Sequence, residues 1–157
     1  MNDLADRLLV ARAVAEGLTD LAADTNPAFR EFGARLVAAE VGRVVMRFDL
    51  DDRWLQGDGV LHGGVVTTLL DSAMAYAAMS TLAPGERTAT VTLTANFLAA
   101  ASIADTEVEA EVEKRGRSLA FLRARLRSAT GAVRATATAT FAIVPAPTAA
   151  TASRSRS

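Results

Sequence analysis

The sequence predicts an α+β fold in which a curved antiparallel β-sheet wraps around one long central helix. Residues 63–80 have a helical pattern that is apolar over more than half of the circumference. Four segments after this helix alternate apolar and polar residues and are joined by short turns, which is typical of antiparallel strands. A helix this apolar must be covered on most sides, and a sheet that curls around it meets that need. This arrangement is the hotdog architecture.

Composition places the chain among globular proteins and excludes several classes of function. Its 157 residues suit one domain with a single core; half are apolar and 22% are charged. The net charge of −1 leaves no basic face for nucleic acid. The absence of cysteine excludes disulfides and thiolate zinc sites, and a single histidine excludes a histidine-rich metal centre within one subunit. We therefore expect no metal and no cofactor.

The sequence also predicts no membrane association. Asp71 and several threonines interrupt the most apolar stretch, so no apolar run reaches membrane-spanning length. The N-terminal residues mix acids with arginines and lack the basic start and apolar block of a secretory signal. We expect a soluble cytoplasmic protein.

The N-terminal segments are predicted in order as a helix, a short turn of helix and a strand. Residues 1–25 are expected to form an amphipathic helix, whose apolar positions at helical spacing are Leu4, Leu8, Ala11, Ala15, Leu18 and Ala22. Asn26 caps a short helix that starts at Pro27, and Gly33 ends it. From Arg35 the period changes, and a strand buries every second residue, namely Val44, Met46 and Phe48.

The C-terminal half is predicted to be all strand. After a Pro-Gly turn, residues 88–98 form a threonine-rich strand. A row of glutamates at 107–113 and a row of arginines at 123–127 follow on consecutive strands, so the rows lie side by side if the strands pair. Residues 133–141 form the last strand. The folded domain is expected to cover 26–144, and the tail, 145–157, to be disordered.

Chemistry is concentrated where the central helix begins. Gly63 and Gly64 open the helix, and their backbone amides have no intrahelical partner and carry the positive end of the helix dipole. Such amides stabilise an oxygen that gains negative charge during a reaction. Asp71 follows His62 by nine residues and therefore projects from roughly the opposite face of the helix. If the two act together, the acid must come from another subunit.

A lone histidine before a helix is more often a capping or packing residue than a catalytic one. Gln56 has an equally ordinary reading as a solvated loop residue. Asp71 is harder to explain structurally, because an unpaired carboxylate on an apolar helix is expensive to bury. A functional role for Asp71 is the interpretation we adopt.

The stretch LQGDGVLHGGVVTTLLDSAMAYAA resembles the signature of the hotdog acyl-CoA thioesterases, in the branch of the phenylacetate-pathway (PaaI-like) and 4-hydroxybenzoyl-CoA thioesterases. That signature has a polar amide residue, His-Gly-Gly and an acid nine positions after the histidine. The downstream stretches VTLTANFLAAA, VEKRGRSLAFLRARL and GAVRATATATFAIV also follow the order of the family. The resemblance covers roughly residues 26–144.

The resemblance implies a role for each matching residue. Asp71 is the implied nucleophile or general base, and the amide of Gly63 the implied donor to the thioester carbonyl. His62 is expected to position that amide, and Gln56 to orient the substrate or a water. The remaining residues expected to bind substrate are Gly64, Arg117 and Ser118, of which the last two match a turn near the CoA phosphates. Family members assemble as dimers or dimers of dimers, with the acid facing the His-Gly-Gly turn of the other subunit.

The predicted function is therefore hydrolysis of an aryl- or medium-chain acyl-CoA to a free carboxylate and CoA. Two alternatives stay open. The first is a hotdog enoyl-CoA hydratase or dehydratase, for which Asp58, four residues before His62, is a weak candidate acid. The second is a non-catalytic module that binds acyl-CoA as a sensor, although neither terminus contains an evident DNA-binding segment.

Overall fold

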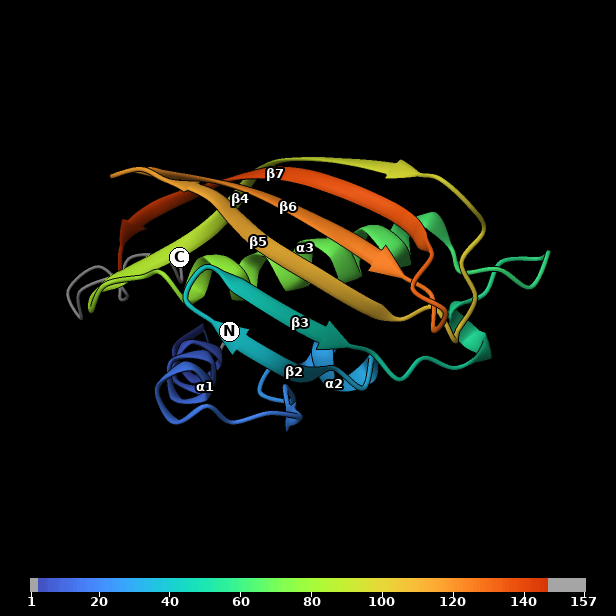
Figure 1. Ribbon diagram of the computed structural model, residues 1–157, viewed down its shortest axis with the longest axis horizontal. Helices are drawn as coiled ribbons and strands as arrows, with labels where there is room; N and C mark the ends of the chain where they lie inside the picture. Colours follow the sequence, from blue (N-terminus) through green and yellow to red (C-terminus); the bar gives the residue numbers. More distant parts are fainter. Residues whose placement is uncertain (1–2, 147–157) are drawn as a thin grey trace, which may run out of the picture.

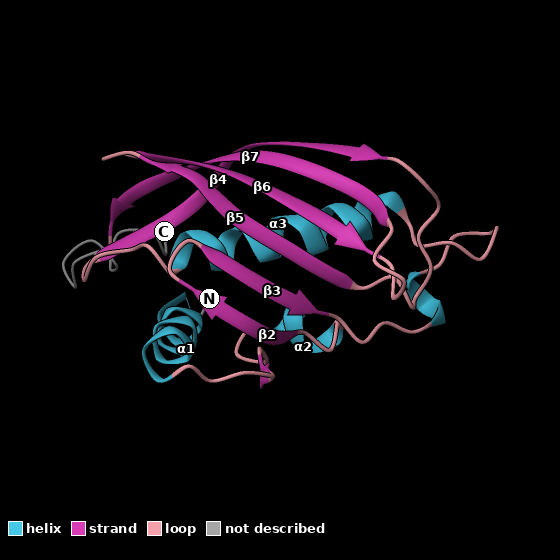
Figure 2. Ribbon diagram, in the orientation of Figure 1, coloured by secondary structure: helices cyan, strands magenta, loops and turns pink. Residues whose placement is uncertain are grey.

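The computed structural model describes residues 3–146 and confirms the α+β architecture. The long helix α3 (Gly63–Met79) lies in the concave side of a curved antiparallel sheet (Figure 1). The remaining elements, coloured by type in Figure 2, are α1 (Asp3–Glu16), β1 (Leu21–Ala22), α2 (Pro27–Glu31), β2 (Arg35–Glu40), β3 (Arg43–Arg47), a 3₁₀ turn (Asp52–Trp54), β4 (Glu86–Phe97), β5 (Glu107–Arg115), β6 (Leu119–Arg127) and β7 (Val133–Pro145). Strand β7 thus reaches Pro145, and the predicted disorder of the tail lies outside the described residues from position 147 onward.

The seven strands form one sheet in the order β1-β2-β3-β5-β6-β7-β4. Each neighbouring pair is antiparallel, and β4 at one edge pairs only with β7. The inward-facing side chains of β3, β5, β6 and β7 pack against α3, and together they form the core. The largest fully buried side chains are Tyr76, Phe48, Phe141, Leu36, Met46, Leu69, Leu70, Met74, Leu122 and Leu126, with Val10 and Val44.

The outer face of the sheet carries the predicted rows of opposite charge. Glu107, Glu109 and Glu111 of β5 lie directly opposite the arginines of β6 at 127, 125 and 123. Strand β3 adds Arg43, whose guanidinium lies 2.9 Å from Glu109 through Nε. These pairs are partly exposed to solvent, so each contributes little stability.

The prediction for residues 1–25 was wrong in the extent of the helix and in its buried face. Helix α1 ends at Glu16 because Gly17 takes a left-handed conformation (φ +63), and Leu21–Ala22 then pair with β2. Leu4 and Leu8, expected to face the core, are 64% and 61% exposed.

A polar anchor determines which face of α1 is buried. Asp6 is only 5% exposed, and its carboxylate accepts hydrogen bonds from the hydroxyls of Tyr76, at 2.8 Å, and Thr25. Val10 and Ala13, on the same side of α1, are fully buried. The spacing of apolar residues did not predict this face, because it gives no sign that an aspartate is buried with two hydrogen-bond donors.

The sequence predicted one strand before the central helix, whereas the structure has the hairpin β2–β3. Only Leu36 of β2 is buried, and the register shifts between Leu36 and Ala38, so the alternation expected of a strand is broken. The predicted short helix after Asn26 is confirmed, with the Asn26 side chain accepting a hydrogen bond from the amide of Ala28 at 3.0 Å.

Candidate active site

Helix α3 borders two cavities, one at its N-terminal end and one farther along it. The first, of about 400 Å³, lies at the N-terminal end of the helix and is lined by Gln56, Gly63, Val66, Phe97 and Ala135, among others. The second, of about 760 Å³, runs along the second half of the helix and is lined by Asp71, Ala75, Tyr76 and Met79 together with residues of α1, α2 and β4. Of the predicted site residues, Gln56 and Gly63 line the first cavity and Asp71 lines the second.

The first cavity exposes the start of α3. His62 is the N-cap residue, and the first internal hydrogen bond of the helix runs from the amide of Val66 to the carbonyl of His62, at 3.1 Å. The amides of Gly63 and Gly64 therefore have no partner inside the helix. The ring of Phe97 packs over Gly63, 3.5 Å from the point where a Cβ atom would stand. A backbone donor at the positive end of the helix dipole thus borders an apolar cavity.

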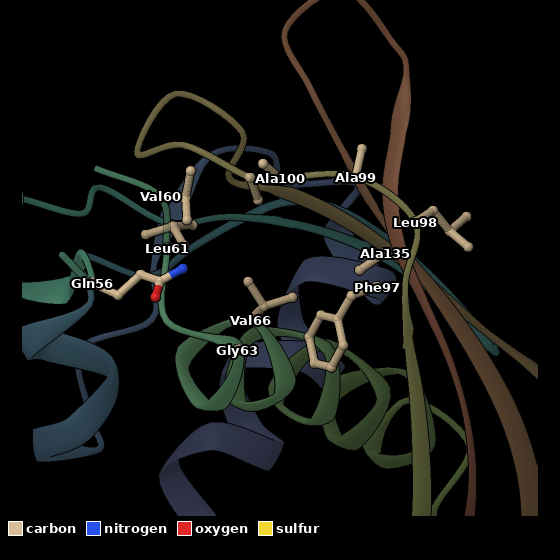
Figure 3. A pocket seen from close by; sticks show the side chains of 11 residues that line it. Gln56, Val60, Leu61, Gly63, Val66, Phe97, Leu98, Ala99, Ala100 and Ala135 are labelled. Atoms are coloured by element: carbon tan, nitrogen blue, oxygen red, sulfur yellow. The ribbon is translucent and has the colours of Figure 1, made fainter. Parts of the chain in front are cut away.

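Gln56 is held at the mouth of this cavity by a small loop. Leu55 and Leu61 form an antiparallel bridge, and the amide of Gln56 donates to the carbonyl of Val60 at 2.8 Å. The turn closes through Gly59, whose φ of +72 favours glycine. Figure 3 shows the Gln56 side-chain amide directed into the space above Gly63. The loop therefore places a donor and an acceptor opposite the start of the helix.

Asp58 stands at the exposed tip of the same loop and does not line the cavity. The geometry gives the hydratase alternative, which depends on that acid, no support.

His62 is fixed by its backbone rather than by its ring. Its amide donates to the carbonyl of Trp54 at 3.1 Å, and its side chain makes no capping hydrogen bond. The ring is exposed, and Nδ1 lies 3.9 Å from the position that a Cβ atom would take at Gly64. The imidazole thus lies beside the first turn of α3. Its expected role in positioning the Gly63 amide stays a prediction.

Asp71 borders the second cavity and is half-buried. The hydroxyl of Thr90, on β4, donates to Oδ1 of Asp71 at 2.9 Å. Burial raises the pKa of Asp71 above the ordinary value of an aspartate, and the hydrogen bond from Thr90 opposes part of that rise. A carboxylate in this setting is less solvated than a surface aspartate, and is therefore a stronger base or nucleophile.

Within one chain, Asp71 lies away from His62, as the sequence predicted. The nine residues from His62 to Asp71 place these two residues about half a turn apart around α3 and about 14 Å apart along it. The different cavities that Asp71 and Gly63 line agree with this separation.

Arg117 and Ser118 lie far from the start of the helix in the same chain. They form the exposed β5–β6 turn, where the Ser118 carbonyl accepts a hydrogen bond from Ile143 at 2.8 Å. Ile143 pairs with Thr88, nine residues along β4 from Phe97, which is a distance of about 30 Å. In Figure 1 this turn lies at the left end of the sheet, whereas α3 begins near the right end.

Sequence reasoning missed Thr90 and Phe97 as site residues. Thr90 is one of several threonines that alternate along β4, and nothing in the sequence singles it out as the partner of Asp71. Phe97 ends the same strand, and only its packing on Gly63 identifies it.

Residues 3–146 contain neither a cluster of metal-ligating side chains nor a membrane-spanning helix. No three His, Asp or Glu side chains in that range converge closely enough to hold a metal ion. No helix in that range is long and apolar enough to cross a membrane.

Comparison with known proteins places this geometry in a family. The sequence profile of the thioesterase superfamily matches residues 58–135, which include the helix start, Asp71 and Thr90. A thioesterase family protein from Silicibacter pomeroyi is 32% identical, with a TM-score of 0.71, and the alignment covers 87% of this chain and 98% of that one. A search of the curated proteins found no match.

Two further solved structures share the fold at lower identity. The Escherichia coli PaaI protein from the phenylacetic acid degradation operon is 20% identical, with a TM-score of 0.74 over 90% of this chain and 96% of that one. A Streptococcus mutans protein solved with acetyl-CoA bound is 24% identical, with a TM-score of 0.65 over 72% of this chain and 90% of that one.

Proposed function

The chain belongs to the thioesterase superfamily, with the hotdog fold, and from this premise we propose that it hydrolyses an acyl-CoA thioester to a free carboxylate and CoA. One observation carries the proposal. Beside one cavity, helix α3 has a backbone amide without a partner among the described residues, and beside another it has a half-buried, hydrogen-bonded carboxylate. Hydrolysis of a thioester uses a donor to the carbonyl oxygen and a base or nucleophile, and these two groups can supply both, whereas binding alone would not need a half-buried carboxylate.

The active protein is, in this proposal, a two-fold dimer or a pair of such dimers. Two copies related by a two-fold axis would place Asp71 of each protomer against Gly63 of the partner subunit and complete two equivalent sites. The edge strand β4 supports such pairing, because its apolar side chains Val91 and Phe97 are 58% and 56% exposed in the single chain. Both cavities border this edge, the first through Phe97 and the second through Thr90.

The reaction follows from the two halves of the composite site. The thioester oxygen accepts a hydrogen bond from the Gly63 amide, and the helix dipole stabilises the negative charge that develops there. Asp71 either removes a proton from an attacking water or attacks the carbonyl carbon itself, and CoA leaves as the thiolate; in the second route, water then hydrolyses the acyl–Asp71 anhydride to the free carboxylate and restores Asp71. Gln56 orients the substrate or the water, and His62 positions the Gly63 amide. In this proposal CoA is held by Gly64 of one subunit and by the Arg117–Ser118 turn of another, because the turn of the same chain lies far from the helix start; arginine suits a phosphate.

The acyl group is assigned to the second cavity. Its volume of about 760 Å³ and its apolar residues Phe29, Ala75 and Met79 suit an aryl or medium-chain acyl group. The acetyl-CoA bound to the Streptococcus mutans relative supports a CoA thioester as the ligand class. We place the reaction in the cytoplasm.

The test is thiol release from a panel of aryl- and alkyl-CoA thioesters, with Asp71→Ala measured beside the native protein. Release by the native protein alone supports the proposal and identifies the acyl preference. No release across the panel, together with tight binding of the same esters, would instead support the sensing module. Activity that survives in Asp71→Ala would contradict the assigned mechanism.

A further inference from the structure

The Asp71 carboxylate is held on one side only. Oδ1 accepts the hydrogen bond from Thr90 at 2.9 Å, while Oδ2 has no hydrogen-bond partner among residues 3–146. The two side chains come from different elements, Asp71 from the middle of α3 and Thr90 from the edge strand β4. Their contact therefore depends on how β4 presents Thr90 to the helix.

A β-bulge in β4 determines which face of the strand carries the Thr90 side chain. Thr90 lies opposite Phe141 of β7, and Thr92 lies opposite Thr140, the next residue along, so Val91 has no partner. Before the bulge, Thr88 and Thr90 share the inward face with the buried Ile143 and Phe141. After it, the inward face passes to the odd-numbered residues, of which Leu93 lies opposite the buried Ala139.

Without the extra residue, Thr90 would belong to the same face as Thr92 and Thr94. These two lie opposite Thr140 and Thr138, on the outer side of the sheet. A strand of strict two-residue period would then direct the Thr90 hydroxyl away from α3. The bulge is thus the feature that aims one particular hydroxyl at Asp71, as bulges beside active sites do elsewhere.

We propose that Thr90, aimed by the bulge at Val91, is a positioning residue for hydrolysis: its hydroxyl fixes Oδ1 of Asp71 and leaves Oδ2 free to face the thioester carbonyl or the attacking water. This inference rests on the proposed thioesterase function and adds the residue that orients its acid. A carboxylate held by one oxygen keeps a single orientation without losing the basicity of the other.

No charged side chain bonds to Asp71 within the described residues, so the hydrogen bond from Thr90 is the main contact that lowers its pKa. The titratable side chains that face the same cavity are Asp6 and Arg7 of α1, Tyr76 of α3 and Arg87 of β4. None of them forms a hydrogen bond or ion pair with Asp71 within the described residues, and Asp6 is already paired with Tyr76. Loss of the Thr90 hydroxyl would therefore raise the pKa of Asp71 further, since burial would act unopposed.

The experiment compares Thr90→Val, which keeps the shape and removes the hydroxyl, with Thr90→Ser, which restores it. Thr92→Val is the matched control, because it removes a hydroxyl from the same strand on the outward face. Steady-state thiol release is measured across pH, with unfolding temperatures recorded for each variant. If Thr90→Val is poorly folded, Thr90→Ala is measured in its place.

We expect Thr90→Val to lower kcat by roughly ten- to a hundredfold, which is the range for a hydrogen bond to a charged group. KM should be nearly unchanged. The acidic limb of its pH–kcat profile should move to higher pH, and Thr90→Ser should recover most of both effects. Native kcat and an unmoved limb in Thr90→Val would overturn the inference, as would an equal loss in Thr92→Val.

Measuring Asp71→Ala in the same assay distinguishes an error about Thr90 from an error about the proposed function. If Asp71→Ala is inactive and Thr90→Val is fully active, only the role proposed for Thr90 is wrong. An active Asp71→Ala removes the thioesterase mechanism on which that role depends.

Discussion

The two halves of the proposed site are built in different ways. The amide half is made of backbone: a helix start, two glycines and a loop closed by the hydrogen bond between Gln56 and Val60. The acid half is made of side chains from distant segments, with Asp71 on α3 and Thr90 on β4, beside a cavity that α1 and α2 also line. The backbone of the first half is set mainly by local sequence, whereas the second half depends on how distant segments of the chain pack.

This difference determines how each half responds to substitution. A backbone amide survives almost any change of side chain and is lost only to proline. A carboxylate held by burial and one hydrogen bond changes its pKa and its orientation with every neighbour. Substitutions around Asp71 can therefore change the reaction rate by degrees, whereas the Gly63 amide can only be kept or removed.

The largest effect is expected from Asp71→Asn, which keeps the shape of the side chain and removes its basicity. Activity should fall by roughly a hundred- to ten-thousandfold, the range of general-base catalysis. Thiol release from the best ester of the panel is the measurement. Retention of more than a tenth of native kcat would contradict the role assigned to Asp71.

Gly63→Pro tests the amide half directly. Gly63 is the first residue of α3, where proline is tolerated, and His62 already has the extended conformation (φ −61, ψ 134) required before proline. The change removes the N–H without breaking the helix, and kcat should fall by roughly a hundred- to a thousandfold, as for other oxyanion donors.

Gly63→Ala is the matched control for that variant, because it keeps the N–H and its Cβ atom meets Phe97 at an ordinary 3.5 Å. Its kcat should exceed that of Gly63→Pro by at least tenfold. Equal activity of the two variants, with native unfolding temperatures, would show that the amide donates nothing to the reaction.

The raised pKa of Asp71 has opposite consequences for activity and stability. Activity needs the carboxylate, so kcat should begin to fall at a pH above the ordinary range of aspartate. For stability, a raised pKa in the folded state favours the protonated form, and that benefit is lost as pH rises through it. At neutral pH, Asp71→Asn should therefore melt at a higher temperature than the native protein.

The gain in melting temperature should disappear near about pH 3, where aspartate is protonated in both states. Thermal melts of both proteins at the two pH values provide the check. A lower melting temperature for Asp71→Asn at neutral pH would mean that the ionised carboxylate stabilises the fold, against the account of its burial.

The smallest effect is expected at Tyr76, which lines the second cavity beside Asp71. Tyr76→Phe removes the hydroxyl that donates to the buried carboxylate of Asp6 at 2.8 Å, and leaves Thr25 as its remaining donor. The free energy of unfolding should fall by about 1–3 kcal/mol, the cost of an underpaired buried polar group. Urea denaturation measures this directly, and a loss below about 0.5 kcal/mol would show that this bond does not secure α1.

The sequence predicted the amide half better than the acid half, for physical reasons. Helix starts, glycine turns and apolar stripes are local patterns, so the position of Gly63 and the separation of Asp71 from His62 followed from residue spacing. The bulge at Val91 leaves no local mark, because Thr90 and Thr92 look equivalent in an alternating strand. The face of α1 was missed likewise, because Asp6 is buried by partners far along the chain.

The most direct test of the account is a mixing experiment between two inactive variants, Asp71→Asn and Gly63→Pro. If each site takes its acid from one subunit and its amide from the other, a hybrid dimer contains one site with both changes and one that is fully native. Subunits unfolded and refolded together should then regain about a quarter of the native activity, because half of the dimers are hybrids with one working site of two. If acid and amide act within one chain, every site in the mixture carries a defect, and the refolded mixture would stay as inactive as its components.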